Sequence, residues 1–137
     1  MIVADTGAIV ALIDADDEHH ETMVELYEER PADWVLPWAI LPEVDYLLSE
    51  HVGDKAQRAF LADLASGAFA VEWGSQLDIV RSRKICEQYR SLKLGLVDAT
   101  VMAIAERLKA RAIATLDVSN FGPVKIAGSP KLFPRDA

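Results

Sequence analysis

The stretch Leu94–Asp117, LGLVDATVMAIAERLKARAIATLD, predicts a helix followed at once by a strand. Its first part has apolar residues at helical spacing, and its second part is a short apolar run that stops at an acid. The same alternation continues in both directions, with short β-like runs separating longer stretches of helical period. The sequence therefore predicts an α/β protein built on a central, mainly parallel β-sheet.

The other strands are expected at MIVAD, DWVLP and AFAVEW, with one more short strand in the tail after Phe121. Helices are expected at AIVALIDA, at the acidic stretch DDEHHETMVELYEER, over Trp38–His51, over a segment that ends at Gly67, and over residues 76–92. No repeat or long Gly/Ser/Pro linker interrupts this pattern. We expect residues 1–137 to form a single domain.

The composition favours a soluble, self-sufficient domain. With 137 residues and 51% hydrophobic content, the chain is long enough to bury a sizeable core. Its one cysteine, Cys86, excludes a disulfide within the chain. The apolar start contains Asp5 and no basic leader, and no apolar run reaches the ~20 residues that cross a bilayer. We expect a cytoplasmic protein with no membrane contact.

Charge is divided unequally along the chain. Residues 1–80 contain 3 Lys/Arg and 17 Asp/Glu, a balance of -14, whereas residues 81–137 contain 11 and 5, a balance of +6. A net charge of -8 is unusual for a nucleic-acid-binding protein. The basic second part is explained either by solvated helix surfaces or by an anionic partner at residues such as Arg81, Arg83, Lys84, Arg107, Lys109 and Arg111.

Four acids lie where a site could form. Asp98 interrupts an apolar helix, where an N-cap is the ordinary explanation, although Val101 stands where a capping box needs Glu or Gln. Asp5 and Asp117 end two strands, and they converge if those strands are neighbours, because open α/β sheets bind ligands beyond the carboxyl ends of their strands. Glu43 lies one turn from the apolar residues of its helix, so it points toward the interior or its rim.

Inward carboxylates without obvious basic partners repel one another unless a cation offsets their charge. Oxygen ligands alone favour Mg²⁺ or Mn²⁺ over zinc, and none of the three histidines forms a metal-binding spacing with Cys86. The chain has no convincing Ser/His/Asp or Cys/His nucleophile set. These residues indicate metal-assisted hydrolysis, with water as the nucleophile.

Four segments together resemble a PIN-domain ribonuclease of the VapC toxin type. They are IVADTGAIVALID, LPEVDYLLSEHVG, GLVDATVMAIAERL and AIATLDVSNF, in the family's order and at about its spacing. The resemblance implies a three-layer α/β/α sandwich that cleaves RNA with bound Mg²⁺ or Mn²⁺. It matches the catalytic and metal-binding positions to Asp5, Glu43, Asp98 and Asp117, and the supporting positions to Thr6, Thr115 and Asn120, with Phe121 packing behind the last acid.

The resemblance also implies a homodimer and a small antitoxin that covers the acids, often with a basic side chain. The apolar surfaces around Ala8–Ile13 and Ile40–Leu48 are candidates for that contact. One departure is visible: the fourth acid is followed by Val118, Ser119 and Asn120, where many relatives have basic residues. This argues against RNA contact at that loop.

Two alternatives stay open at this level. A catalytically silent PIN-like scaffold could bind RNA or protein without cutting, although the intact acid set argues against it. A haloacid-dehalogenase-type phosphatase also places Asp and Thr after its first strand, but Gly7 stands where that family needs a second Asp. The ribonuclease interpretation ranks first.

Overall fold

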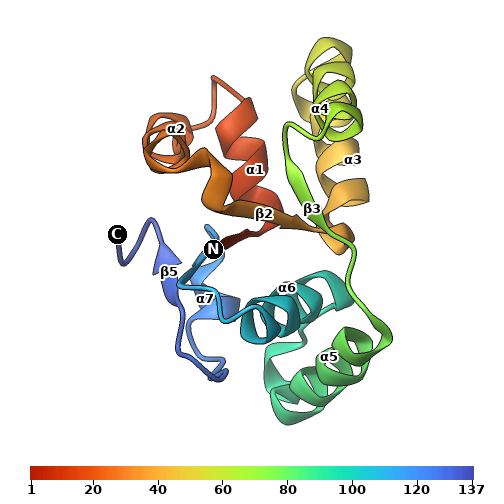
Figure 1. Ribbon diagram of the computed structural model, residues 1–137, viewed down its shortest axis with the longest axis vertical. Coiled ribbons are helices and arrows are strands. Elements are labelled where there is room, and N and C mark those ends of the chain that lie inside the picture. Colours follow the sequence, from red (N-terminus) through yellow and green to blue (C-terminus); the bar gives the residue numbers. More distant parts are fainter.

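A parallel five-stranded sheet forms the centre of the protein in a computed structural model that describes residues 1–137 (Figure 1). The strand order is β3-β2-β1-β4-β5, and every neighbouring pair is parallel. The predicted parallel α/β sheet is therefore confirmed, including the short strand in the tail. The strands are β1 (Ile2–Ala4), β2 (Trp34–Pro37), β3 (Ala70–Glu72), β4 (Ala112–Ala114) and β5 (Lys131–Phe133).

Helices cover both faces of the sheet and make a three-layer sandwich (Figure 1). On one side lie α1 (Thr6–Ile13), α2 (His20–Glu29), α3 (Leu41–His51) and α4 (Asp54–Ser66). On the other lie α5 (Gln76–Gln88), α6 (Leu96–Arg107) and the short α7 (Val118–Phe121). Three 3-10 turns complete the structure, at Pro31–Asp33, Trp38–Ile40 and Arg90–Leu92.

The helix α6 lies at the centre of the lower layer in Figure 1, between the sheet and α5. Seven consecutive residues, Ala99–Ala105, are buried, so this helix has no polar face over two turns. A helix enclosed on all sides must be apolar all round. Its first turn emerges from the packed region and presents Asp98, which is only half-buried.

Two expected boundaries are wrong, and competing polar side chains explain the first of them. The acidic helix begins at His20 and not at Asp16. In the preceding turn the Asp14 carboxylate accepts a hydrogen bond from the Asp16 amide, and the Asp17 carboxylate accepts one from the His19 amide. Such local bonds favour a turn over a helix. Likewise the helix expected over residues 76–92 stops at Gln88 and gives way to a 3-10 turn.

None of the helices is both long enough and apolar enough to span a bilayer. The main core joins the strands to the inner faces of the helices and contains 30 buried residues. Phe121 belongs to it and is only 4% exposed, which confirms the packing role expected of this aromatic residue. The core thus fixes α7, which the sequence did not predict, against the end of β4.

Candidate active site

The site begins where the strand order changes direction. From β1 the chain proceeds to β2 and β3 on one side, and later returns to place β4 on the other side of β1. In the β1–β4 register, Ala4 is opposite Ala114. Asp5 and Thr115 therefore leave the sheet side by side at its carboxyl edge, where open α/β sheets form ligand sites. The expectation that the two strands are neighbours is confirmed.

Asp5 is held by the strand beside it. Its backbone N–H donates to the Ala114 carbonyl oxygen at 2.8 Å, and its carboxylate Oδ2 accepts a hydrogen bond from the Thr115 hydroxyl at 2.9 Å. Asp5 stands at the N-cap position of α1, yet its side chain makes no capping bond, and the residue is only 6% exposed. Its carboxylate is thus oriented by Thr115 and not by the helix that it precedes.

Asp98 and Asp117 are joined through one amide group. Nδ2 of Asn120 donates to Asp117 Oδ2 at 3.0 Å and lies 3.4 Å from Asp98 Oδ2. The cap of α6 is Gly95, so Asp98 is the third helical residue, and the N-cap explanation of Asp98 is wrong. Asp117 does cap a helix, because its Oδ1 accepts from the Asn120 backbone N–H at 3.3 Å.

The hydroxyl of Ser119 also contacts this cluster, since it donates to Asp117 Oδ1 at 2.9 Å. Ser119 was not among the residues expected at the site. The signal in the sequence was a serine two positions after an acid, a spacing at which these polar side chains often hydrogen-bond within a turn. Ser119 holds the outer oxygen of Asp117, whereas Asn120 holds the inner one near Asp98.

All four predicted acids meet around one cavity of about 420 Å³. Glu43 reaches it from the first turn of α3 and is exposed, so it lies at the rim. No lysine, arginine or histidine lines the cavity. The lining consists of Asp5, Thr6, Gly7, Glu43, Leu47, Asp98, Leu116 and Asp117.

Burial and neighbouring negative charges raise the pKa values of Asp5 and Asp98. Burial raises the pKa of Asp5 to about 6, opposed by the hydrogen bond from Thr115 and reinforced by the charges of Asp98 and Glu43. Burial also raises the pKa of Asp98, with the charges of Asp117 and Glu43 acting in the same direction. Both groups are therefore destabilised in the ionised form that a metal ion would need.

The residues present fit a hard divalent cation by donor type. Every polar group in the lining is an oxygen donor, and the Thr6 hydroxyl is buried without a hydrogen-bond partner. No three His, Cys, Asp or Glu side chains are gathered closely enough to hold one ion by themselves. One or two carboxylates per ion, completed by water, is the arrangement that Mg²⁺ commonly takes in proteins.

The raised pKa of Asp5 predicts a pH-dependent loss of stability in the metal-free protein. Because the pKa of about 6 in the folded protein exceeds the ordinary value of 3.8, the contribution of Asp5 to stability is fully present below pH 3.8 and is lost as the pH rises through 6. Asp5→Asn lacks this loss. In EDTA we expect its free energy of unfolding to exceed that of the wild type by up to about 3 kcal/mol at pH 8, with the difference vanishing near pH 4.

Urea unfolding of both proteins from pH 4 to pH 8 measures this difference. Asp16→Asn is the matched control, because Asp16 is exposed and its replacement should leave the pH dependence unchanged. A difference between Asp5→Asn and the wild type that stays constant over this range would contradict the prediction.

Three of the basic residues considered for phosphate contact have acidic partners, and one of them, Arg111, lies 3.8 Å from Asp33. Arg81 pairs with Glu106 through Nε–Oε1 at 2.6 Å. Arg107 makes a two-pronged contact with the buried Asp78, at 2.7 Å and 3.0 Å, and also bonds to Glu72 at 2.8 Å. These pairs join α5, α6 and β3. Arg83 and Lys84 form no ion pair and are exposed on α5.

Comparison with known proteins finds one matching family and a relative that covers nearly the whole chain. The family model described as PIN domain matches residues 2–121. Ribonuclease VapC26 of Mycobacterium tuberculosis (strain ATCC 25618 / H37Rv) is 29% identical over 127 residues, which cover 93% of this chain and 94% of the relative.

Solved structures show the same fold. VapC20 of Mycobacterium tuberculosis, described as a Sarcin-Ricin loop cleaving toxin, superposes with a TM-score of 0.81 at 22% identity, covering 93% of this chain and 98% of the other. VapBC2 of Rickettsia felis, solved with a DNA fragment from its promoter, gives 0.68 at 18% identity, covering 96% and 97%. FitAcB of Neisseria gonorrhoeae gives 0.65 at 16% identity, covering 97% and 96%.

Proposed function

Because the chain belongs to the PIN-domain family, we propose that it is a metal-dependent endoribonuclease, the toxin of a toxin–antitoxin pair, with residues 1–137 acting as a single PIN-like domain. One observation carries this proposal: four carboxylates from four segments of the chain line one cavity that contains no basic residue. The ribonuclease name of the VapC26 relative supports RNA as the substrate. We infer that the protein acts in the cytoplasm, where such a substrate is available.

In this proposal Asp5, Glu43, Asp98 and Asp117 hold Mg²⁺ or Mn²⁺. When bound, the ion supplies a Lewis acid that offsets the carboxylate charge, polarises the phosphodiester and lowers the pKa of the attacking water. The protein's own residues set the positions: Thr115 orients Asp5, and Asn120 holds Asp98 beside Asp117. Thr6 adds a buried hydroxyl with no other partner.

A bound metal ion explains how an acidic protein can act on an anionic polymer, because no cationic side chain lines the cavity. Without metal the carboxylates repel a phosphate, and with metal the sign of the local field reverses. Burial is the largest cause of the raised pKa of Asp5 and of Asp98, and the charges of neighbouring carboxylates add to it in the metal-free site. RNA affinity should therefore depend on the ion as strongly as cleavage does.

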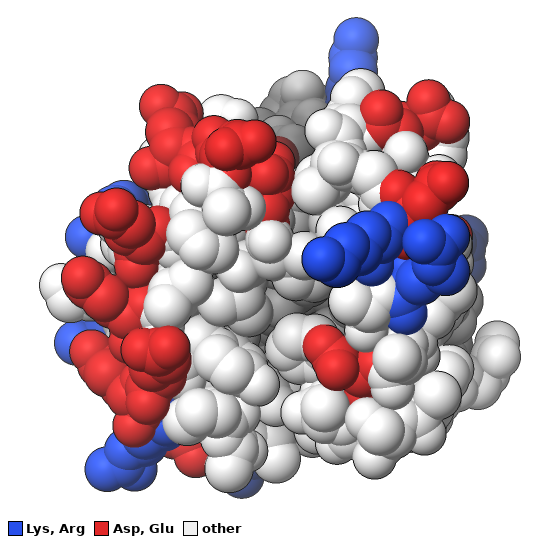
Figure 2. Space-filling model, turned by 90° about the horizontal axis from the view of Figure 1, so that it is seen from above, with Lys and Arg blue, Asp and Glu red and all other residues white.

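We propose that the antitoxin docks in the hollow between α1–α2 and α3–α4. In Figure 2 uncharged side chains line this hollow, and the acidic side chains gather over α2 at its left edge. On α1 the side chains of Val10 and Ile13 are only half-buried, and Tyr46 on α3 is 60% exposed. An apolar segment with basic flanks fits this surface, to which only the half-buried and exposed residues of the two stretches named from the sequence contribute, because Ala8, Ile9, Val44 and Leu48 are buried in the core.

The homodimer is best supported by an apolar surface at the start of α5. Trp73 and Leu77 are each 73% exposed and Val80 is 43% exposed; Trp73 lies in the segment just before α5, and Leu77 and Val80 lie three residues apart on one side of the helix. Exposed apolar clusters of this kind mark interaction surfaces. We expect Leu77→Asp to convert a dimer into a monomer of 15.1 kDa in sedimentation velocity. Leu61→Asp is the control, because Leu61 is a 46% exposed leucine on α4, in the opposite layer of the sandwich; loss of the dimer in both variants would contradict this surface.

The function is tested by letting a bacterial cell supply every RNA. Wild type and Asp98→Asn are induced separately, and new 5′-phosphate RNA ends are mapped across the transcriptome while both proteins are quantified. Ends produced only by the wild type would support an acid-dependent ribonuclease and identify its target. Identical maps from two abundant, folded proteins would refute it and favour the silent scaffold. The phosphatase alternative predicts hydrolysis of a generic phosphate ester by the wild type.

Asn120 is expected to act as a positioning residue. Replacing it with alanine removes the amide that contacts both Asp98 and Asp117, so nothing holds the two carboxylates in place against their mutual repulsion. We expect cleavage and Mn²⁺ affinity each to fall by about 10- to 100-fold, as for other groups that orient metal ligands. Ser119→Ala is the control, because it removes a contact to the outer oxygen of Asp117 alone. Equal losses in both variants would argue for a purely structural effect on α7.

A further inference from the structure

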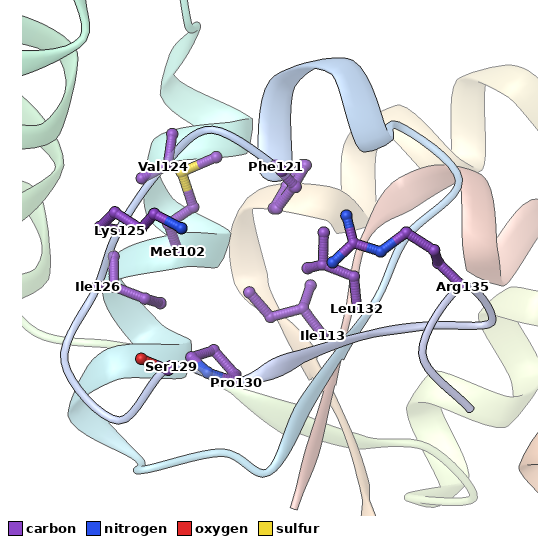
Figure 3. A pocket seen from close by; sticks show the side chains of 11 residues that line it. Met102, Ile113, Phe121, Val124, Lys125, Ile126, Ser129, Pro130, Leu132 and Arg135 are labelled. Carbon is purple, nitrogen blue, oxygen red and sulfur yellow. The ribbon is translucent and has the colours of Figure 1, made fainter.

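A second cavity, of about 120 Å³, lies beside α7 and shares no lining residue with the acidic cavity (Figure 3). Its floor is apolar and comes from four separate elements. The floor residues are all buried: Met102 of α6, Ile113 of β4, Phe121 of α7 and Leu132 of β5. A concave, apolar floor built from rigid elements is the usual basis of a small-molecule site.

The outer wall of this cavity is the segment 122–130, and hydrogen bonds hold it away from the floor. The Lys125 backbone N–H donates to the Tyr89 hydroxyl at 2.9 Å, and the Ala127 backbone N–H donates to Glu106 Oε2 at 2.7 Å. Glu106 is itself fixed by its pair with Arg81. Since both anchors belong to the α5–α6 pair, the wall cannot collapse inward without breaking them. The cavity is preformed.

Two cationic side chains reach over the apolar floor. Figure 3 shows the Lys125 amine and the Arg135 guanidinium directed into the space between them from opposite sides. Arg135 uses Nε and Nη2 to bind Asp136, which leaves Nη1 available, and Lys125 forms no ion pair. No Asp or Glu lines the cavity. Lys125 therefore supplies an unpaired positive charge at the mouth, Arg135 adds a free N–H donor beside its own pair with Asp136, and the interior is apolar.

We propose that this cavity binds a small carboxylate that carries one compact apolar group, of the size and type of benzoate. An apolar cavity of about 150 Å³ accommodates a benzene ring, so the space here is of the right order for one six-membered ring or a branched alkyl group. The ring would lie on Phe121 and Ile113, and the carboxylate would meet Lys125 and Arg135. This site is independent of the metal and of the proposed ribonuclease activity.

The test uses benzoate and its neutral analogue benzyl alcohol, which has the same ring without the charge. Each is titrated into the full-length, ¹⁵N-labelled protein, and backbone amide shifts are followed. We expect saturable benzoate shifts confined to the segments that line the cavity, around Met102, around Ile113 and over residues 121–135, and an affinity about tenfold higher than that of benzyl alcohol. Shifts spread over the whole surface, or equal affinities for the two compounds, would overturn the proposal.

Variants separate a built site from general attraction to a basic surface. The double variant Lys125→Gln, Arg135→Gln should lower benzoate affinity about tenfold and leave benzyl alcohol binding unchanged. Lys131→Gln is the matched control, because Lys131 is an exposed cation of β5 that does not line the cavity. Both cations of the double variant are exposed, so its fold should be retained, as thermal unfolding will verify. An equal loss in the control would show that only net charge matters.

Discussion

Asp98→Asn is expected to lower RNA cleavage by about a thousandfold or more while leaving the fold intact. Asparagine has the shape of aspartate but lacks the charge that binds a cation. The Asn120 side-chain amide contacts both Asp98 and Asp117. The pKa of Asp98 is raised by burial and by the charges of Asp117 and Glu43. Removing its charge therefore removes repulsion as well as one of the proposed metal ligands.

The measurement combines cleavage, Mn²⁺ binding and urea unfolding on the purified proteins. Cleavage and Mn²⁺ affinity should both be lost, whereas the free energy of unfolding in EDTA should equal or exceed that of the wild type. Asp45→Asn is the matched control, since Asp45 lies two residues from Glu43 but bonds to Gln57 and does not line the cavity. A variant that unfolds, or one that still cleaves normally, would remove Asp98 from the proposed catalytic set.

The largest effect on stability is expected from Arg107→Met. The Arg107 guanidinium supplies the only cation paired with Asp78, whose side chain is 3% exposed. Methionine preserves much of the aliphatic stem and leaves that carboxylate buried without a counter-charge. Breaking one side of a buried ion pair costs about 3 to 5 kcal/mol, and we expect a loss of that size in the free energy of unfolding.

This loss should appear in chemical unfolding at neutral pH. Arg111→Met is the control, because Arg111 is 48% exposed and lies 3.8 Å from Asp33, so its removal should cost less than about 1 kcal/mol. Similar losses in both variants would mean that burial of Asp78 does not govern the effect. The prediction also separates structural from functional basic residues, since Arg107 was one of the side chains considered for RNA contact.

The two kinds of buried acid in this protein have opposite consequences. Asp78 is neutralised by Arg107 and joins β3, α5 and α6. Asp5 is almost as buried, yet its raised pKa reflects burial and neighbouring charges that the Thr115 hydroxyl only partly offsets. Substitution is therefore expected to destabilise the first and to stabilise the second. A buried acid that weakens the metal-free fold is best explained by a role in binding a cation.

Much of the fold could be predicted from the sequence because it depends on neighbours in the chain. The apolar run around Ile113 and the helical spacing around Met102 indicate a strand and a helix without reference to anything distant. Their alternation predicts a parallel sheet, and the position of Asp5 and Asp117 at strand ends places both at the edge where ligands bind. The four acids were therefore named from local pattern and the resemblance that their segments carry.

Contacts between distant segments could not be predicted in this way. Thr115 orients Asp5 across 110 residues, Arg107 neutralises Asp78 across 29, and Asn120 reaches Asp98 across 22. Only the packing of β4 against β1, and of α7 and α5 against α6, brings these partners together. Periodicity reports which face of an element is buried, whereas hydrogen bonds and charge pairing depend on what the buried face meets. The sequence by itself therefore determined the acids and the sheet, and the tertiary structure decided which acid is paired, which is left unpaired, and where a second cavity opens.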